Sequence, residues 1–164
     1  IIYGDYNPDG KLPITYPRNT NGITLYDHKP MESFEGNIYN PLYPFGHGLS
    51  YTTFETSGLA IDKTYVNANE IINVTVNVKN TGSRSGKESV LLYLHDVAAS
   101  VTRPNKQLKA FKKIGLLPGQ TEKLSFTLTP YDLSFIGVDL KRIVEPGEFT
   151  VMVGNETANF WVTK

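Results

Sequence analysis

The stretch Ile72-Asn73-Val74-Thr75-Val76-Asn77-Val78-Lys79 decides the fold class, because apolar side chains occupy every second position in it. Alternate residues of a β-strand point to opposite faces of a sheet, so the pattern predicts a strand with one buried face. The same alternation recurs at 124–129, 149–153 and 158–162. The apolar run 89–94 predicts a central strand, and weaker patterns predict strands at 54–61 and 108–114.

Turn and cap residues separate these strands. Leu117-Pro118-Gly119-Gln120 and Glu145-Pro146-Gly147-Glu148 each carry a central Pro-Gly pair, which predicts type II turns. Thr129 followed by Pro130 predicts a helix of one or two turns through Leu133. About seven short strands with polar turns predict a mainly β protein, an immunoglobulin-like or fibronectin type III-like antiparallel β-sandwich over 54–164. Such sandwiches have many functions, so the fold alone assigns no activity.

Residues 1–53 differ in composition from the rest of the chain. Ten of the 19 aromatic residues lie within positions 1–54, as do six of the ten prolines. Proline at this density disfavours long helices and central strands, which predicts an irregular Pro- and aromatic-rich segment ahead of the sandwich. Its aromatic side chains must then pack against their own domain or against a partner.

Composition excludes several classes of function. The 164 residues contain 16 Lys plus Arg and 16 Asp plus Glu, so the net charge is zero, and there is no cysteine. Disulfides, thiolate catalysis and cysteine-based metal sites are therefore excluded. No apolar run is long enough for a membrane helix, which predicts no membrane partner. The chain begins at Ile1 without an initiator Met, which suggests a processed or excised chain.

A basic run between 103 and 113 leaves two interpretations open. Nucleic-acid binding is one, and a Lys-rich edge strand that discourages pairing between sheets is the other. Zero net charge favours the second, so no nucleic-acid partner is expected. The run consists of Arg103, Lys106, Lys109, Lys112 and Lys113.

Catalytic motifs are scarce. His28, His47 and His95 have no metal-ligand spacing, so no metal and no cofactor are expected. His95-Asp96 is interpreted as a strand-end pair rather than an acid–base dyad. Gly46-His47-Gly48 is interpreted as a tight bend with aromatic residues on both sides. Glycoside hydrolysis needs two carboxylates, but the spacing of Glu32 and Glu35 does not favour that role.

Two longer strings carry a resemblance to a known family. Residues 4–18 are Gly-Asp-Tyr-Asn-Pro-Asp-Gly-Lys-Leu-Pro-Ile-Thr-Tyr-Pro-Arg, and residues 41–54 are Pro-Leu-Tyr-Pro-Phe-Gly-His-Gly-Leu-Ser-Tyr-Thr-Thr-Phe. Both resemble the C-terminal part of glycoside hydrolase family 3, the β-glucosidases and β-xylosidases. Further similarity lies at Val78-Lys79-Asn80-Thr81-Gly82, Arg103-Pro104 and Val144-Glu145-Pro146-Gly147. Asp9 and His47 depart from the family's usual Ser and Tyr.

The resemblance implies a division of the chain at 53/54. Residues 1–53 would be the tail of an α/β sandwich domain and an interdomain linker, and 54–164 the fibronectin type III-like domain. The family's nucleophile and acid/base lie in earlier domains, so no catalytic residue is carried over to this chain. Tyr26-Asp27-His28-Lys29-Pro30 resembles a family loop that can approach the active-site mouth. Tyr26, His28 and Tyr39 are therefore candidates for lining that mouth, and the shortened loop suggests an altered substrate preference.

The resulting hypothesis is a non-catalytic C-terminal portion of a retaining exo-β-glycosidase, inactive alone, that packs on and orients the catalytic domains. Its partners would be those N-terminal catalytic domains and, for the whole enzyme, β-linked gluco- or xylo-oligosaccharides or aryl glycosides. The location expected is periplasmic or extracellular, with the cytoplasm left open. The alternative is a free-standing carbohydrate-binding or adhesion module, in which Trp161 and clustered tyrosines form a stacking platform, although its strand neighbours predict that Trp161 is partly buried.

Overall fold

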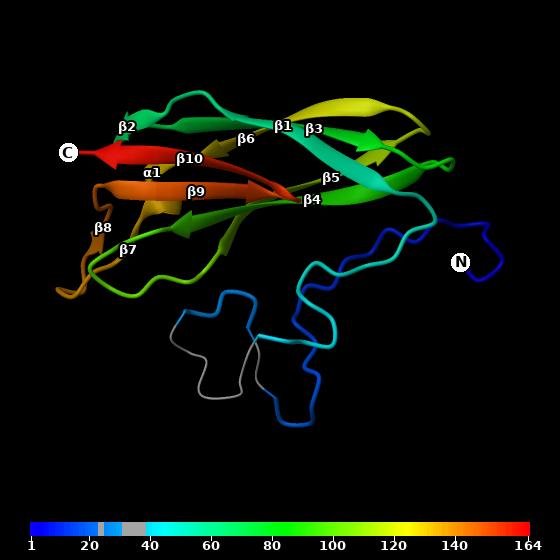
Figure 1. Ribbon diagram of the computed structural model, residues 1–164, viewed down its shortest axis with the longest axis horizontal. Coiled ribbons are helices and arrows are strands. Elements are labelled where there is room, and N and C mark those ends of the chain that lie inside the picture. Colours follow the sequence, from blue (N-terminus) through cyan, green and yellow to red (C-terminus); the bar gives the residue numbers. More distant parts are fainter. Residues whose placement is uncertain (23–24, 31–38) are drawn as a thin grey trace.

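The computed structural model describes residues 1–22, 25–30 and 39–164 and confirms a mainly β architecture (Figure 1). Two sheets form a sandwich. The three-stranded sheet has the order β1-β3-β6 and contains β1 (Phe54–Ile61), β3 (Ile72–Asn80) and β6 (Thr121–Leu128). The five-stranded sheet has the order β2-β10-β9-β4-β5 and contains β2 (Tyr65–Asn67), β4 (Gly86–Asp96), β5 (Gln107–Leu116), β9 (Gly147–Val153) and β10 (Glu156–Thr163).

Strand pairing is antiparallel throughout the two sheets, except that β2 pairs with β10 in parallel. A further small sheet joins β7 (Phe135–Ile136) to β8 (Arg142–Ile143). β4 lies between β9 and β5, which confirms the central strand expected at 89–94. β5 is an edge strand, as the Lys-rich pattern predicts.

The core lies between the two sheets and follows from the period-two pattern. Val74, Val76 and Val78 of β3 point inward and are buried, while the intervening residues face outward. They belong to one apolar cluster with the inward side chains of the opposite sheet. Burying this apolar surface is the main stabilising contribution to the sandwich. The opposing side chains include Val90, Leu92, Leu94, Phe149, Val151, Val153, Phe160 and Val162.

The expected helix and one of the two expected turns are present. α1 spans Pro130–Leu133, and the Thr129 backbone and hydroxyl both donate to the Asp132 carboxylate at 2.7 Å. Gly119 has φ of 74°, and Gln120 N–H donates to the Leu117 carbonyl at 3.0 Å, as a type II turn requires. The type II turn expected at 145–148 is wrong. Gly147 has no positive φ and instead begins β9, paired with Val162.

The described residues of 1–53, called here the N-terminal segment, contain no helix or strand and only one isolated bridge, between Tyr16 and Tyr43. The segment lies below the sandwich in Figure 1, beside β4. None of its described apolar side chains belongs to the buried core, whose first member along the chain is Val66. Within the described ranges, no helix is both long and apolar enough to cross a bilayer.

Candidate functional site

Tyr26 connects the N-terminal segment to the five-stranded sheet. Its ring stacks on Phe45 at 4.5 Å between centroids and lies 6.1 Å from the ring of Tyr93 on β4. Its hydroxyl accepts a hydrogen bond from the Leu108 backbone of β5 at 3.4 Å. Tyr26 is thus held by two strands of the sandwich through packing and through a hydrogen bond. The rings of Tyr26, Phe45 and Tyr93, together with those of His28 and Tyr39, are called here the aromatic junction.

His28 and Tyr39 form a second pair within the aromatic junction. Their rings stack at 4.3 Å with an interplanar angle of 15°. The His28 carbonyl accepts a hydrogen bond from Asn105 N–H at 3.0 Å, which attaches this part of the segment to the loop between β4 and β5. The structure therefore places the three candidate residues beside the sandwich, with Tyr26 packed on β4 and His28 on Tyr39.

Tyr93 was not singled out in the sequence, yet it lies at the base of the aromatic junction. Burial, with smaller effects from Tyr26 and Tyr39, raises the pKa of Tyr93 to about 12. The Lys106 ammonium lies 4.8 Å from the centre of the Tyr93 ring, a cation–π geometry. Tyr93 is therefore a neutral phenol at physiological pH. The positive charge beside its ring belongs to the Lys106 ammonium.

Gly46 allows the segment to approach β4 closely. Its φ is 82°, and a Cβ at this position would lie 3.0 Å from Leu91 Cδ1. Phe45 and His47 on either side stack on Tyr26 and Tyr43, respectively. The expectation of a tight bend carrying aromatic residues is confirmed.

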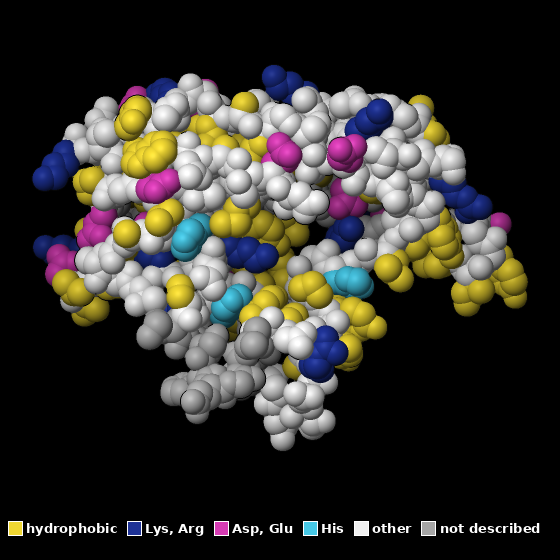
Figure 2. Space-filling model, viewed as in Figure 1, with side chains coloured by type: hydrophobic (Ala, Val, Ile, Leu, Met, Phe, Trp, Pro, Cys, Tyr) yellow, Lys and Arg dark blue, Asp and Glu magenta, His cyan; other side chains and the backbone are white. Residues whose placement is uncertain are grey.

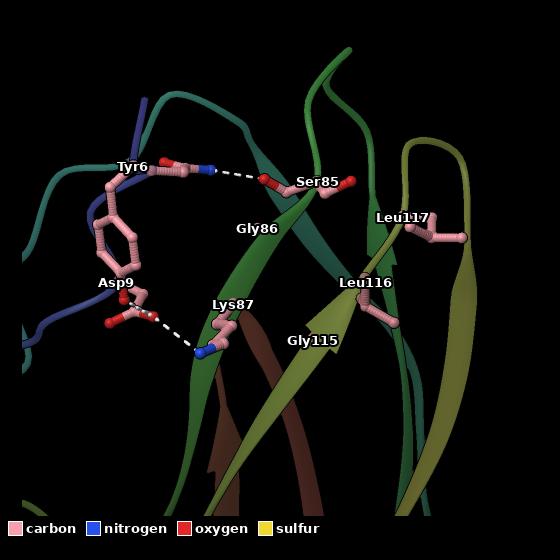
Figure 3. Close-up of a pocket in the computed structure, with 9 residues that line it drawn as sticks. Tyr6, Asp9, Ser85, Gly86, Lys87, Gly115, Leu116 and Leu117 are labelled. Atoms are coloured by element: carbon pink, nitrogen blue, oxygen red, sulfur yellow. Dashed lines mark hydrogen bonds and ion pairs between the residues drawn. The ribbon is translucent and has the colours of Figure 1, made fainter. Parts of the chain in front are cut away.

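Asp9 forms a second connection between the segment and the sandwich (Figure 3). Its carboxylate lies 3.6 Å from Lys87 Nζ on β4, as drawn in Figure 3. It also lies 2.9 Å from Lys113 Nζ on β5 and accepts a hydrogen bond from the Tyr6 hydroxyl. The hydrogen bond from Lys113, followed by that from Tyr6, lowers the pKa of Asp9 below its ordinary value. These four residues are called here the Asp9 cluster, and three of them, Tyr6, Asp9 and Lys87, border a pocket of about 340 Å³. In the sequence, Asp9 is one of the acidic residues of the irregular segment and a departure from the family's usual Ser, and no local pattern connects it to Lys87 or Lys113.

Asn80, at the end of β3, is a third connection and is buried. Its side-chain oxygen accepts hydrogen bonds from the Thr52 hydroxyl at 2.6 Å and from Gly82 N–H at 3.1 Å. Its amide group donates to the carbonyls of Arg84 at 2.8 Å and Leu116 at 3.1 Å. The string 78–82 that carries part of the family resemblance therefore has a structural role, which its composition alone did not indicate.

No acid–base site forms at the end of β4. His95 Nδ1 lies 3.0 Å from the Pro104 carbonyl, while Asp96 lies 3.4 Å from Arg103 Nε. Burial raises the pKa of Asp96, although Arg103 opposes this shift. The Arg103 guanidinium also lies 4.6 Å from the Phe135 ring, so both residues hold the loop after β4 in place. Glu32 and Glu35 lie outside the described residues.

The basic run is occupied by contacts within the chain. Lys112 Nζ donates to the Ser125 carbonyl at 2.6 Å and lies 5.5 Å from the Phe126 ring. Lys113 binds Asp9, and burial lowers the pKa of Lys109. These contacts favour the edge-strand interpretation over a nucleic-acid surface. Among residues 1–22, 25–30 and 39–164, no group of three or more His, Asp or Glu side chains could hold a metal ion.

The N-terminal segment exposes many apolar side chains, visible below the sandwich and at the right of Figure 2. Eleven of the 21 exposed large apolar residues in the described chain lie within its first 51 positions. A mostly apolar groove of about 770 Å³ runs between the first 16 residues and residues 43–49 of the segment. The eleven exposed apolar residues are called here the segment surface. They are Ile1, Ile2, Tyr3, Tyr6, Ile14, Tyr16, Leu25, Leu42, Tyr43, Leu49 and Tyr51.

Comparison with known families assigns both parts of the chain. Residues 1–51 match the model of the glycosyl hydrolase family 3 C-terminal domain, and residues 88–157 match that of the fibronectin type III-like domain. The two matches occur in the order expected from the resemblance in the sequence.

Individual relatives cover nearly the whole chain. A putative beta-xylosidase of Formosa agariphila is 42% identical, in an alignment that covers 98% of this chain and 22% of that protein. The periplasmic beta-glucosidase of Salmonella typhimurium is 40% identical over 96% of this chain and 22% of its own length. A solved b-glucosidase of Erythrobacter marinus has a TM-score of 0.92 at 37% identity, over 99% of this chain and 23% of that one. The chain thus spans about a fifth of the length of the relatives it matches.

Proposed function

The chain belongs to glycosyl hydrolase family 3 as a C-terminal portion, and from this premise we propose that it packs on and orients the catalytic domains of a retaining exo-β-glycosidase. The whole enzyme would hydrolyse β-linked gluco- or xylo-oligosaccharides or aryl glycosides. Its nucleophile and acid/base would lie in the preceding domains, and this chain alone would be inactive. Residues 1–53 would be the tail of an α/β domain and a linker, followed by the sandwich from 54.

The observation that carries this proposal is the segment surface. Its side chains are apolar and exposed, and none contributes to the core of the sandwich. Exposed apolar surface on this scale is typical of an interaction site. Burying one such side chain completely stabilises an interface by roughly 1.5–3 kcal/mol. A large, permanent contact with the remaining part of the enzyme would account for this surface.

The three connections to the sandwich support an orienting role. The aromatic junction, the Asp9 cluster and Asn80 fix the segment to β3, β4 and β5 through side chains. A body docked on the segment surface would therefore be held at a defined angle to the sandwich. We further propose that Tyr26, His28 and Tyr39 lie near the active-site mouth of the assembled enzyme.

Replacing the matching C-terminal part of the Salmonella typhimurium beta-glucosidase with this chain tests the proposal. The chimera is expected to hydrolyse an aryl β-glucoside, whereas the isolated chain and the truncated enzyme are expected to be inactive. Hydrolysis by the isolated chain, or a folded chimera no more active than the truncated enzyme, would contradict the proposal.

A periplasmic or extracellular location is the corresponding proposal for the whole protein. It is supported by the relative from Salmonella typhimurium, which is named a periplasmic beta-glucosidase. Fractionation of cells that express the natural protein, followed by detection with an antibody against this chain, would test it.

A further inference from the structure

Two aromatic side chains lie side by side on the outer face of the five-stranded sheet. Tyr65 of β2 is in register with Trp161 of β10, and their ring centroids lie 5.7 Å apart with 30° between the planes. Tyr65 is 67% exposed and Trp161 is 36% exposed, which confirms that Trp161 is partly buried. β2 is the edge strand, so no further strand covers Tyr65 on its outer side.

The surroundings of this pair are polar. On its other side Trp161 is paired with Glu148, whose carboxylate accepts a hydrogen bond from Asn159 at 2.7 Å. The Thr163 hydroxyl lies on the same face beside Asn67, at 3.4 Å. Carboxylate, amide and hydroxyl groups can accept and donate hydrogen bonds to a ligand rich in hydroxyl groups.

The pair lies at the opposite edge of the sheet from the N-terminal segment. The segment contacts β4 and β5, whereas β2 and β10 occupy the other end of the strand order (Figure 1). Docking through the segment surface therefore does not require this edge to be covered. Two aromatic side chains are also too few for a stable protein interface, which typically buries about 800 Å² on each partner.

We propose that Tyr65 and Trp161 form a platform that binds a β-linked glucan or xylan chain on the sandwich, away from the catalytic domains. Aromatic rings at an exposed site offer a flat apolar surface to the C–H face of a pyranose ring. Glu148, Asn159 and Thr163 would bind the sugar hydroxyls at the rim. The choice of β-linked sugars rests on the proposed function, while the platform itself rests on the geometry of the exposed pair.

Binding of cellohexaose and xylohexaose to the 164-residue chain tests the platform. Trp161 is the single tryptophan, so a saturable change in its fluorescence on titration reports contact at this site directly. Calorimetry then measures the variants Tyr65→Ala and Trp161→Ala, each of which is expected to raise Kd about tenfold or more. Trp161→Phe keeps an aromatic ring and is expected to retain most of the affinity.

Tyr131→Ala is the matched control, because Tyr131 is 68% exposed but lies in α1 against Arg142. It is expected to leave Kd unchanged. Absence of saturable binding to either oligosaccharide, or unchanged Kd in folded Tyr65→Ala, would overturn the platform. Equal affinity for α-linked maltohexaose would overturn the β-linked assignment. If Trp161→Ala does not fold, Tyr65→Ala at the edge strand carries the test. The platform is tested by oligosaccharide binding to the chain, whereas docking is tested by hydrolysis in the chimera. Failure of one proposal can therefore be distinguished from failure of the other.

Discussion

At the scale of single residues, Asn80 shows how one buried amide can join three separate parts of the chain. Its oxygen contacts the end of the N-terminal segment, and its nitrogen contacts the loop after β3 and the end of β5. Both donor hydrogens and the acceptor are therefore used. A buried polar group that is satisfied in this way costs little, whereas its loss leaves several unpaired groups behind.

Substitution of Asn80 is expected to destabilise the chain strongly. Asn80→Leu should reduce the free energy of unfolding by about 3 kcal/mol, because the Thr52 hydroxyl and two carbonyls lose their partner. Asn80→Asp is nearly isosteric but places a carboxylate oxygen against those carbonyls. At pH 7 it should reduce the free energy of unfolding by at least as much as Asn80→Leu. Urea unfolding measures both, with Asn155→Ala in the exposed β9–β10 turn as control. Asn80→Asp within about 0.5 kcal/mol of the parent would contradict this role.

Tyr93 predicts a specific dependence of stability on pH. Its pKa is raised from 10.0 to about 12 in the folded chain, so the folded state retains the proton that the unfolded state loses above pH 10. The contribution of Tyr93 is thus complete below pH 10 and is lost as the pH rises toward 12. Urea unfolding from about pH 8 to about pH 11.5 begins below the unfolded pKa and ends just below the folded pKa. Over this range the free energy of unfolding should fall more steeply with pH in the parent than in Tyr93→Phe.

Tyr93→Phe is a suitable comparison because it keeps the ring that contacts Tyr26 and Lys106. All other groups that titrate in this range are the same in both proteins, so only the difference between the two profiles is interpreted. Parallel profiles would mean that Tyr93 ionises equally easily in the folded and unfolded states. Absorbance at the tyrosinate band provides an independent check.

At the scale of elements, strand formation followed from the sequence wherever apolar periodicity was long enough. The alternation at 72–79 and the apolar run at 89–94 correspond to β3 and β4. β2, by contrast, has three residues and obtains its place only from parallel pairing with β10, 96 positions later in the case of Tyr65 and Trp161. β7 and β8 have two residues each, so neither could show a period. The prediction of a type II turn at 145–148 was wrong because β9 begins at Gly147, which pairs with Val162 of β10.

The Asp9 cluster determines how firmly the N-terminal segment is attached to β4 and β5. Asp9→Asn removes the charge that Lys87 and Lys113 bind, so the segment should detach more often. Surface ion pairs are individually weak, and tryptic cleavage after Lys11 and Arg18 is expected to accelerate only about two- to fivefold. Asp5→Asn, at an exposed position of the same segment, is the control and should leave the rate unchanged.

The same cluster should respond to acid. The pKa of Asp9 is lowered in the folded chain, so its contribution is present at neutral pH and is lost as the pH falls below 3.8 through the lowered value. Added salt should also weaken the cluster, because screening acts on exposed charges. A cleavage rate in Asp9→Asn equal to that of the parent, at low salt and neutral pH, would contradict the attachment role.

At the scale of the whole molecule, the chain combines a sandwich that has its own apolar core with a segment whose apolar side chains are largely exposed. The core of the sandwich could be anticipated from alternating residues that are neighbours in sequence. The connections to the segment could not, because Asp9 and Lys113 are separated by 104 positions and Thr52 and Asn80 by 28. Such contacts depend on the completed fold and leave no local periodic signal. The role of Tyr26, His28 and Tyr39 at the enzyme's mouth stays a prediction.

Polar substitutions on the segment surface should affect the assembled enzyme and spare the isolated chain. Ile14→Ser combined with Leu49→Ser is expected to change the unfolding free energy of the isolated chain by less than about 0.5 kcal/mol, since both side chains are exposed. In the chimera, each buried apolar side chain lost should cost roughly 1.5–3 kcal/mol, lowering the temperature at which activity is lost. Thermal inactivation of the chimera measures this.

Val138→Ser is the control for the segment surface, because Val138 is also exposed but lies between β7 and β8. It should leave both the isolated chain and the chimera unchanged. A chimera that tolerates Ile14→Ser and Leu49→Ser without loss of thermal stability would show that the segment surface does not contact the catalytic domains.

The sparse backbone pairing of the N-terminal segment, outside the contacts between residues 12–16 and 42–47, affects the rate at which its amide hydrogens exchange. Besides the bridge between Tyr16 and Tyr43, its described backbone is joined mainly by short turns and by contacts such as Leu12 with His47. Amide hydrogens there can exchange with solvent through small local openings, whereas those of β3 and β4 require the sandwich to open. In the isolated chain the segment should therefore take up deuterium early. When the chain assembles with the proposed catalytic domains, deuterium uptake by the segment should slow. The time at which uptake slows would therefore report when assembly takes place.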